Sequence, residues 1–305
     1  MTLTDTILMI EPVAFGYNPQ TSVNNHFQND EDKNNKEVQQ RALAEFTTMV
    51  EMLRANGVDV ITVKDTPYPH TPDSIFPNNW ISFHIANSAV FYPMFAENRR
   101  LERRMDVLLA VEQHRNAKYE FKDYSHFEQE ERFLEGTGSM IFDRENRVAY
   151  AALSQRTDKA LFLDFCRELN FKPIYFDATQ QVGNERLAIY HTNVMMCIAD
   201  TYAVVCLNCI EDEKEREKLV ETLKSTKKEI VEISEEQMNQ FAGNMLQVKN
   251  KQGEKILVMS QTAYNSLNEN QIAYLKSQNK LLVPAIPTIE KNGGGSVRCM
   301  MAEVF

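Results

Sequence analysis

Apolar and polar positions repeat along the chain in one order: an amphipathic helix, a strand, a loop and a pair of apolar strands. In the first unit, residues 36–56 carry apolar side chains at helical spacing and end at Asn56-Gly57, which is typical of a helix C-terminus. A strand is expected at residues 58–63. The same step from helix to strand recurs at residues 118–121, 173–176, 229–233 and 280–283, at intervals of 60, 55, 56 and 51 residues. This spacing predicts five related units.

A second series of short polar residues lies at the start of apolar strands, at intervals of 60, 54, 51 and 52 residues. Its members are Asn79, Ser139, Asn193, Asn244 and Ser296. The last of these strands, which holds Cys299, has no room for a partner before Phe305, but residues 6–10 form a strand that can pair with it. A solenoid would usually repeat at a shorter period and carry terminal caps. We therefore predict a single α/β domain of residues 1–305, a ring of five units closed by the N-terminal strand.

The overall charge narrows the possible partners. The net charge of −10 argues against nucleic acid or a membrane surface, which would favour a basic face. No apolar stretch approaches the 18 residues of a membrane span, and residues 1–12 lack the basic start of a signal peptide. The odd number of cysteines, five, suits reduced thiols. The sequence thus predicts a cytoplasmic protein with a small-molecule substrate.

One mouth of such a ring would gather the polar residues that precede the strands. They are Asp73, Asn78, Asn79, Glu135, Thr137, His191, Asn193, Asn244 and Cys299. A cysteine, a histidine and a carboxylate from three different units are what covalent catalysis by a thiol requires. Of the six histidines, only His191 opens such a strand. Cys206 and Cys209 form a C-x-x-C without a second ligand pair, which argues against a zinc site.

Several of these motifs resemble those of the pentein superfamily, which contains arginine deiminases and amidinotransferases. They are Glu135-Gly-Thr-Gly, His191-Thr-Asn193 and the run from Gly293 to Met300. Residues 21–28, 76–80 and 191–196 are similar to the citrulline-utilisation hydrolase branch. The resemblance covers essentially the whole chain and implies a five-bladed ββαβ propeller.

The resemblance also implies a role for each residue. Cys299 would attack the central carbon of a guanidinium or ureido group, and His191 would protonate the leaving nitrogen and then activate water. Glu135 would bind the substrate nitrogens, and Arg156 would hold the substrate carboxylate. Neither a metal ion nor an organic cofactor is needed. Residues 18–35 are expected to form either a disordered linker or, preferably, a lid with Asn24, Asn25 and Gln28 as contacts.

Two positions depart from the arginine-converting members, which carry aspartate where this chain has Asn79 and Asn193. Each carboxylate lost from a buried guanidinium is expected to cost about 3–5 kcal/mol. An amide, in contrast, matches a neutral ureido group. Citrulline, cleaved to ornithine, ammonia and carbon dioxide, is therefore the favoured substrate, with Asn78 and Asn25 as further contacts. The alternatives are an arginine deiminase in which Glu135 and Asp73 meet the cation, an amidinotransferase, and a non-catalytic binding module.

Overall fold

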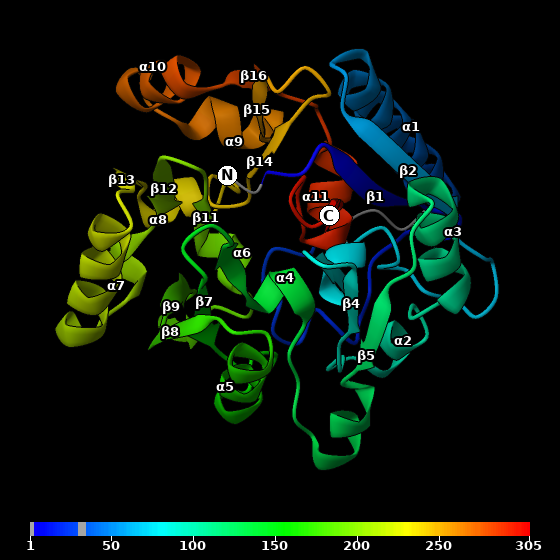
Figure 1. Ribbon diagram of the computed structural model, residues 1–305, viewed down its shortest axis with the longest axis horizontal. Coiled ribbons are helices and arrows are strands. Elements are labelled where there is room, and N and C mark those ends of the chain that lie inside the picture. The colour runs from blue at the N-terminus through cyan, green and yellow to red at the C-terminus, as the bar shows by residue number, and fades with distance from the viewer. Residues whose placement is uncertain (1–2, 30–34) are drawn as a thin grey trace.

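The computed structural model describes residues 3–29 and 35–305. It is a mixed α/β fold in which five three-stranded sheets share one topology (Figure 1). In each sheet the first two strands are antiparallel and the third is parallel to the second. The predicted repeat of five units is confirmed at the level of strand pairing.

Four of the sheets are built from strands consecutive in sequence. Their strands are β3 (Ile81–His84), β4 (Ser88–Phe91), β5 (Glu120–Asp123); β6 (Ile141–Asp143), β7 (Val148–Leu153), β8 (Lys172–Asp177); β11 (Met196–Ile198), β12 (Tyr202–Val205), β13 (Glu229–Glu232); and β14 (Leu246–Lys249), β15 (Lys255–Val258), β16 (Lys280–Leu282). A separate hairpin pairs β9 (Thr179–Val182) with β10 (Glu185–Ala188).

The parallel pairs explain the helices, because a parallel strand can be reached only through a crossover. The crossovers contain α1 (Asn35–Ala55), α2 (Glu97–Arg100) with α3 (Met105–Arg115), α5 (Lys159–Glu168), α7 (Glu213–Ser225), and α9 (Gln261–Ser266) with α10 (Glu269–Gln278). The apolar positions noted in the first predicted helix are the buried face of α1: Val38, Ala42, Phe46, Met49, Val50 and Leu53. No helix in the described part of the chain is both long enough and apolar enough to cross a bilayer.

The fifth sheet joins the two ends of the chain. Strand β1 (Thr6–Glu11) pairs antiparallel with β17 (Ala302–Val304), with Thr6 opposite Val304, and parallel with β2 (Asp59–Lys64). The N-terminal strand therefore supplies the partner of the last strand, as the sequence predicted.

Three of the polar residues that precede the strands, Asn79, Ser139 and Asn193, lie in single helical turns and not in the strands themselves. These turns are η1 (Pro77–Asn79), α4 (Gly136–Ser139) and α6 (Thr192–Met195). Cys299 was expected in a strand, and this expectation was wrong: residues 296–300 form a turn after α11 (Pro287–Gly293), and β17 starts only at Ala302. The turn satisfies its own backbone, because Cys299 N–H donates to Ser296 O at 2.9 Å and Arg298 donates to Met301 O at 2.8 Å.

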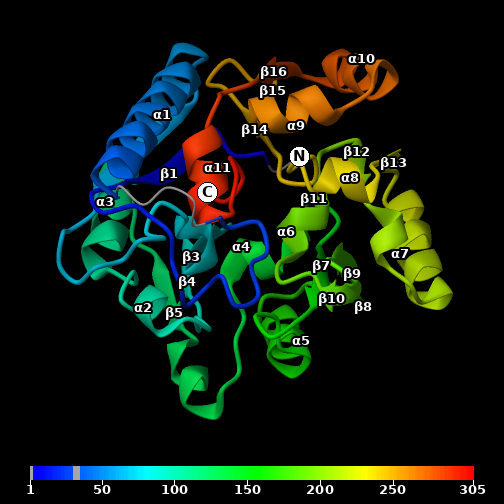
Figure 2. The ribbon, with the colours of Figure 1, turned by 180° about the vertical axis from the view of Figure 1, so that it is seen from behind.

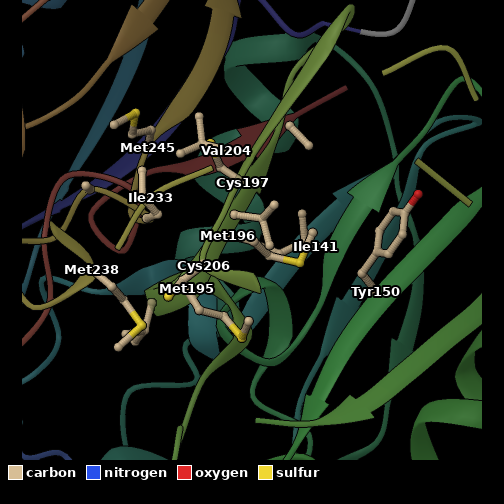
Figure 3. Packing of buried hydrophobic residues seen from close by; sticks show 14 of the residues in the cluster. Ile141, Tyr150, Met195, Met196, Cys197, Val204, Cys206, Ile233, Met238 and Met245 are labelled. Carbon is tan, nitrogen blue, oxygen red and sulfur yellow. The ribbon is translucent and has the colours of Figure 1, made fainter. Parts of the chain in front are cut away.

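The largest apolar cluster packs behind one of these turns (Figure 3). It contains Met195 from α6 together with Cys206 and Met238, all fully buried. The Cys206 N–H donates to the Met195 carbonyl at 2.9 Å. Because protein interiors are closely packed, this contact fixes α6 relative to the core. The apolar cluster thus fixes the position of α6, the helical turn that follows His191 and carries Asn193.

Candidate active site

A small cavity collects most of the predicted site residues. Cys299, His191, Asn79, Arg156, Asp73 and Asn25 all line it. Its free volume is about 10 Å³, room for about one water molecule. The site is therefore closed in this conformation.

Cys299 sits at the cavity between two amide groups. Its side chain is 4% exposed, and its Sγ lies 3.3 Å from Nδ2 of Asn193 and 3.3 Å from Nδ2 of Asn244. N–H donors stabilise a thiolate, which is the nucleophilic form of cysteine. The surroundings of Cys299 thus suit a nucleophile.

His191 and Glu135 form a buried pair. Nε2 of His191 lies 2.7 Å from Oε2 of Glu135. Burial lowers the pKa of His191 to about 4, against the opposing effect of Glu135. Burial alone would raise the pKa of Glu135, but Arg156 and the His191 hydrogen bond outweigh it and bring this pKa to about 2. At neutral pH the pair is a neutral imidazole beside a carboxylate, so His191 is able to accept a proton.

Arg156 crosses from the third unit toward residues 18–29. Its NH2 group donates to Thr21 O at 2.8 Å and to Oδ1 of Asn24, and its NH1 group lies 3.6 Å from Oε2 of Glu135. Its Nε has no hydrogen-bond partner within the described residues. A buried guanidinium with an unused donor suits an anionic ligand group.

Asp73 lines the same cavity. Its Oδ2 accepts from Nδ2 of Asn18 at 2.7 Å and from Oγ1 of Thr21 at 3.0 Å. Its Oδ1 is buried and has no partner in residues 3–29 and 35–305. Burial raises the pKa of Asp73, opposed chiefly by the charge of Arg99. An unused carboxylate oxygen suits a cationic ligand group.

Residues 18–29 cover the cavity, as expected of a lid. Gln28 Nε2 donates to Gly293 O at 2.9 Å, and Asn25 Nδ2 donates to Gly293 O and Gly294 O at 3.4 Å each. Figure 2 shows this segment, in dark blue, crossing the face of the molecule in front of α4 and beside α11. Residues 30–34 of the predicted lid lie outside the described residues.

Asn79 is oriented by a buried ion pair that sequence reasoning missed. Its Oδ1 accepts from NH1 of Arg99 at 2.8 Å, and Arg99 is held by Glu102 through two hydrogen bonds of 2.9 Å. The side chains of Arg99 and Glu102 are 3% and 1% exposed. The spacing of three residues between opposite charges was the available signal.

Asn78, predicted to bind substrate, does not line the cavity but accepts from Nδ2 of Asn79 at 3.0 Å.

Gly138 leaves the room that the site needs. A Cβ added at this position would lie 2.5 Å from Nδ2 of Asn79 and 2.8 Å from Nδ1 of His191. Glycine in the motif after Glu135 therefore lets Asn79 and His191 approach the same point. Among the residues that the structure describes, no three His, Cys, Asp or Glu side chains form a group that could hold a metal ion.

Comparisons with known proteins place this fold. Residues 11–305 match the family model described as N,N dimethylarginine dimethylhydrolase, eukaryotic. No curated protein sequence matched the chain. Among solved structures, the substrate-bound N-terminal domain of ArgZ, an arginine dihydrolase from cyanobacteria, is 18% identical with a TM-score of 0.72, and the match covers 98% of this chain and 97% of that one. A dimethylarginine dimethylaminohydrolase adduct with S-methyl-L-thiocitrulline is 13% identical with a TM-score of 0.66, over 99% of each chain.

The chain spans only 40% of the chain in the apo structure of ArgZ, which aligns with 97% of this chain at 17% identity and a TM-score of 0.72. At such identities the solved structures establish the fold, whereas the family match extends over nearly the whole sequence. The chain therefore belongs to the family described as N,N dimethylarginine dimethylhydrolase, eukaryotic, in agreement with its resemblance to the pentein superfamily.

Proposed function

We propose that this protein hydrolyses the ureido group of citrulline, giving ornithine, ammonia and carbon dioxide, with Cys299 as nucleophile. The observation that carries the proposal is the contact of 2.8 Å between the Arg99 guanidinium and Oδ1 of Asn79. A buried cation already occupies the carbonyl side of this amide. One N–H of its Nδ2 donates to Oδ1 of Asn78 at 3.0 Å, so what Asn79 has left for a ligand is the second N–H donor.

The charge balance of the cavity favours a neutral reacting group. Arg99 and Arg156 are buried cations that line it. The carboxylate of Glu135 is shared by Arg156 and His191, and both oxygens of Glu102 accept from the Arg99 guanidinium at 2.9 Å. A guanidinium offers five donors and a positive charge, and needs free carboxylates. A ureido group is neutral and brings a carbonyl acceptor for an amide N–H.

The buried polar atoms of the cavity that lack a hydrogen-bond partner suit the α-carboxylate and α-ammonium groups of an amino-acid substrate. Within the described residues, Nε of Arg156 and Oδ1 of Asp73 are buried without partners and belong to residues of the same cavity. We assign Arg156 to the α-carboxylate and Asp73 to the α-ammonium. The Oδ1 of Asn193, also unpartnered among these residues, would accept from a ureido N–H.

The chemistry follows from these positions. Neutral His191 takes the thiol proton, and the Cys299 sulfur forms a bond to the ureido carbon. The bond from that carbon to the ornithine nitrogen breaks as His191 returns the proton to this nitrogen, leaving a carbamoyl group on sulfur. His191 then removes a proton from water, whose oxygen attacks the carbamoyl carbon. The thiol is regenerated, and the released carbamic acid decomposes to ammonia and carbon dioxide.

Arginine is the second candidate substrate. The family model is named for dimethylarginine, and a matched structure is an arginine dihydrolase, so relatives with this fold act on guanidino groups. The free oxygen of Asp73 and the carboxylate of Glu135 would then meet the cation. Transfer to an amine in place of water would make the protein an amidinotransferase.

We also propose that the five sheets are the blades of one closed ring and form a single catalytic domain. The identical strand pairing in all five and the sheet shared by β1 and β17 support this arrangement. In Figure 1 the sheets lie around α11 and the C-terminus.

The test is the release of ornithine, citrulline and ammonia from citrulline, arginine and dimethylarginine. The wild type is compared with Cys299→Ala and with Cys166→Ala, a buried cysteine outside the cavity. Ornithine from citrulline, lost only in Cys299→Ala, is the expected result. Citrulline formed from arginine, without turnover of citrulline, would refute the ureido assignment. Activity retained in Cys299→Ala would refute the thiol mechanism.

A further inference from the structure

Asn244 has an amide whose orientation is fixed by the backbone. It lies just before β14, and its Oδ1 accepts from the Arg298 N–H at 3.0 Å. Its Nδ2 donates to the Asn193 carbonyl at 3.0 Å. A backbone N–H only donates and a carbonyl only accepts, so exchanging the amide oxygen and nitrogen would lose both bonds.

The second hydrogen of this amide is therefore available to Cys299. Nδ2 of Asn244 lies 3.3 Å from Sγ. Asn193 donates to the same sulfur at 3.3 Å, but its Oδ1 has no partner in the described ranges, so nothing there fixes its orientation. Of the two amides at the sulfur, Asn244 is the one locked as a donor.

The position of Asn244 is itself set by a close contact between two units. A Cβ added at Gly243 would lie 2.8 Å from the carbonyl carbon of Met195 and closer still to Val194 O. The turn before β14 thus lies directly against α6, with no space for a side chain between them. This contact brings Asn244 from the fourth hairpin to the thiol that precedes β17.

The ionisable groups near the thiol have hydrogen-bond partners other than the sulfur. Those that face Cys299 from the surrounding elements are His191, Tyr190, Asp73, Arg99, Arg156 and Arg298. His191 is hydrogen-bonded to Glu135, and the Tyr190 hydroxyl donates to Gly294 O at 2.9 Å. The Arg298 guanidinium donates to Met301 O and to the Glu303 carboxylate. Direct hydrogen bonds to the sulfur come from neutral amides.

We propose that Asn244 is a catalytic residue whose fixed N–H donor stabilises the thiolate of Cys299. The inference rests on the proposed function only in taking Cys299 as the nucleophile, and it applies to a ureido or a guanidino substrate alike. When the sulfur becomes bonded to carbon, the charge that Asn244 stabilises is gone, and the same donor serves the thiolate again when it leaves in the second step.

The experiment measures the thiol without any substrate. The rate of iodoacetamide alkylation of Cys299 is followed from pH 5 to 10 by peptide mass mapping, which separates Cys299 from the other cysteines. Asn244→Ala removes the donor, and the pKa of Cys299 should rise by about 1 to 2 units, since a hydrogen bond to a charged group is lost. Asn244→Asp keeps the acceptor for Arg298 N–H but places a carboxylate at the sulfur, and should raise the pKa further.

Asn268→Asp is the matched control. Asn268 caps α10 far from the cavity, and aspartate is an equally good cap, so the pKa of Cys299 should stay at the wild-type value. An unchanged pKa in both Asn244 variants would overturn the proposal. If circular dichroism shows that Asn244→Ala is unfolded, the pKa of Cys299 in the isosteric Asn244→Asp variant serves as the test by itself. Because no substrate is used, the outcome of this experiment does not depend on whether the protein hydrolyses citrulline.

Discussion

Nε2 of His191 and Oε2 of Glu135 lie 2.7 Å apart in a region where both side chains are at most 3% exposed. The carboxylate is thus the partner of the imidazole before any substrate enters. Glu135 also accepts from the Phe95 N–H at 2.9 Å, so its position is fixed from two sides. His191 is thereby held facing the cavity, and its Nε2 is already used in the hydrogen bond to Glu135.

This pair predicts how stability depends on pH. The pKa of His191 is lowered from 6.5 to about 4 in the folded state, so its contribution is fully present above pH 6.5 and is lost as pH falls through 4. Between pH 7.5 and pH 5 the free energy of unfolding should fall by about 2 kcal/mol from this residue. Urea denaturation at both pH values measures the fall. His191→Gln should remove that part of the difference, whereas His114→Gln, at a partly exposed helix end, should leave it intact.

The orientation of Asn79 predicts a change of substrate preference. Asn79→Asp would place a carboxylate beside Arg99 and replace the N–H donors that a ureido oxygen requires. We expect kcat/KM for citrulline to fall by more than about tenfold, because a buried donor is exchanged for an acceptor. The ratio of citrulline to arginine turnover should shift toward arginine. If the ratio were the same in Asn79→Asp and wild type, Asn79 would have no part in selecting the reacting group.

The space at Gly138 predicts a variant that folds but does not react. In Gly138→Ala the new methyl group would press on Asn79 and His191, and a displacement of about 1 Å at a reacting group costs about 100-fold in rate. Steady-state turnover and circular dichroism together check this. Gly16→Ala meets its nearest atom at 3.8 Å, an ordinary contact, and should keep full activity.

The lid predicts a change in backbone protection. Gln28→Ala removes two hydrogen bonds of 2.9 Å, one to Thr21 Oγ1 and one to Gly293 O. Amide hydrogens of residues 18–29 should exchange faster by about fivefold, since about 1 kcal/mol of local stability is lost. Hydrogen exchange followed by mass spectrometry measures it. Ser22→Ala, which removes an exposed hydrogen bond to Pro19 O, is the comparison. Equal exchange in both variants would mean that Gln28 does not hold the segment.

The hydrophobic and polar pattern was enough to predict the five units, the pairing of the first and last strands and the placement of Cys299 and His191 at one cavity. Helix and strand periods and the repeat length determine these features. The same pattern could not predict the hydrogen-bond partners of the site residues. Arg99 and Glu102 lie in a segment rich in charged residues, yet the fold buries both and brings Arg99 against Asn79. The amide orientation of Asn244 depends on backbone groups from two other units, and no local pattern specifies it.

Thr6 and Val304 face each other in one sheet although almost the whole chain separates them. Contacts between residues so distant in sequence form late, because the entropy of closing the loop must first be overcome. The turn that bears Cys299 lies between α11 and β17, just before this junction. We infer that a chain with four assembled units still lacks a positioned nucleophile. The placement of the reactive thiol thus depends on the pairing of the first strand with the last.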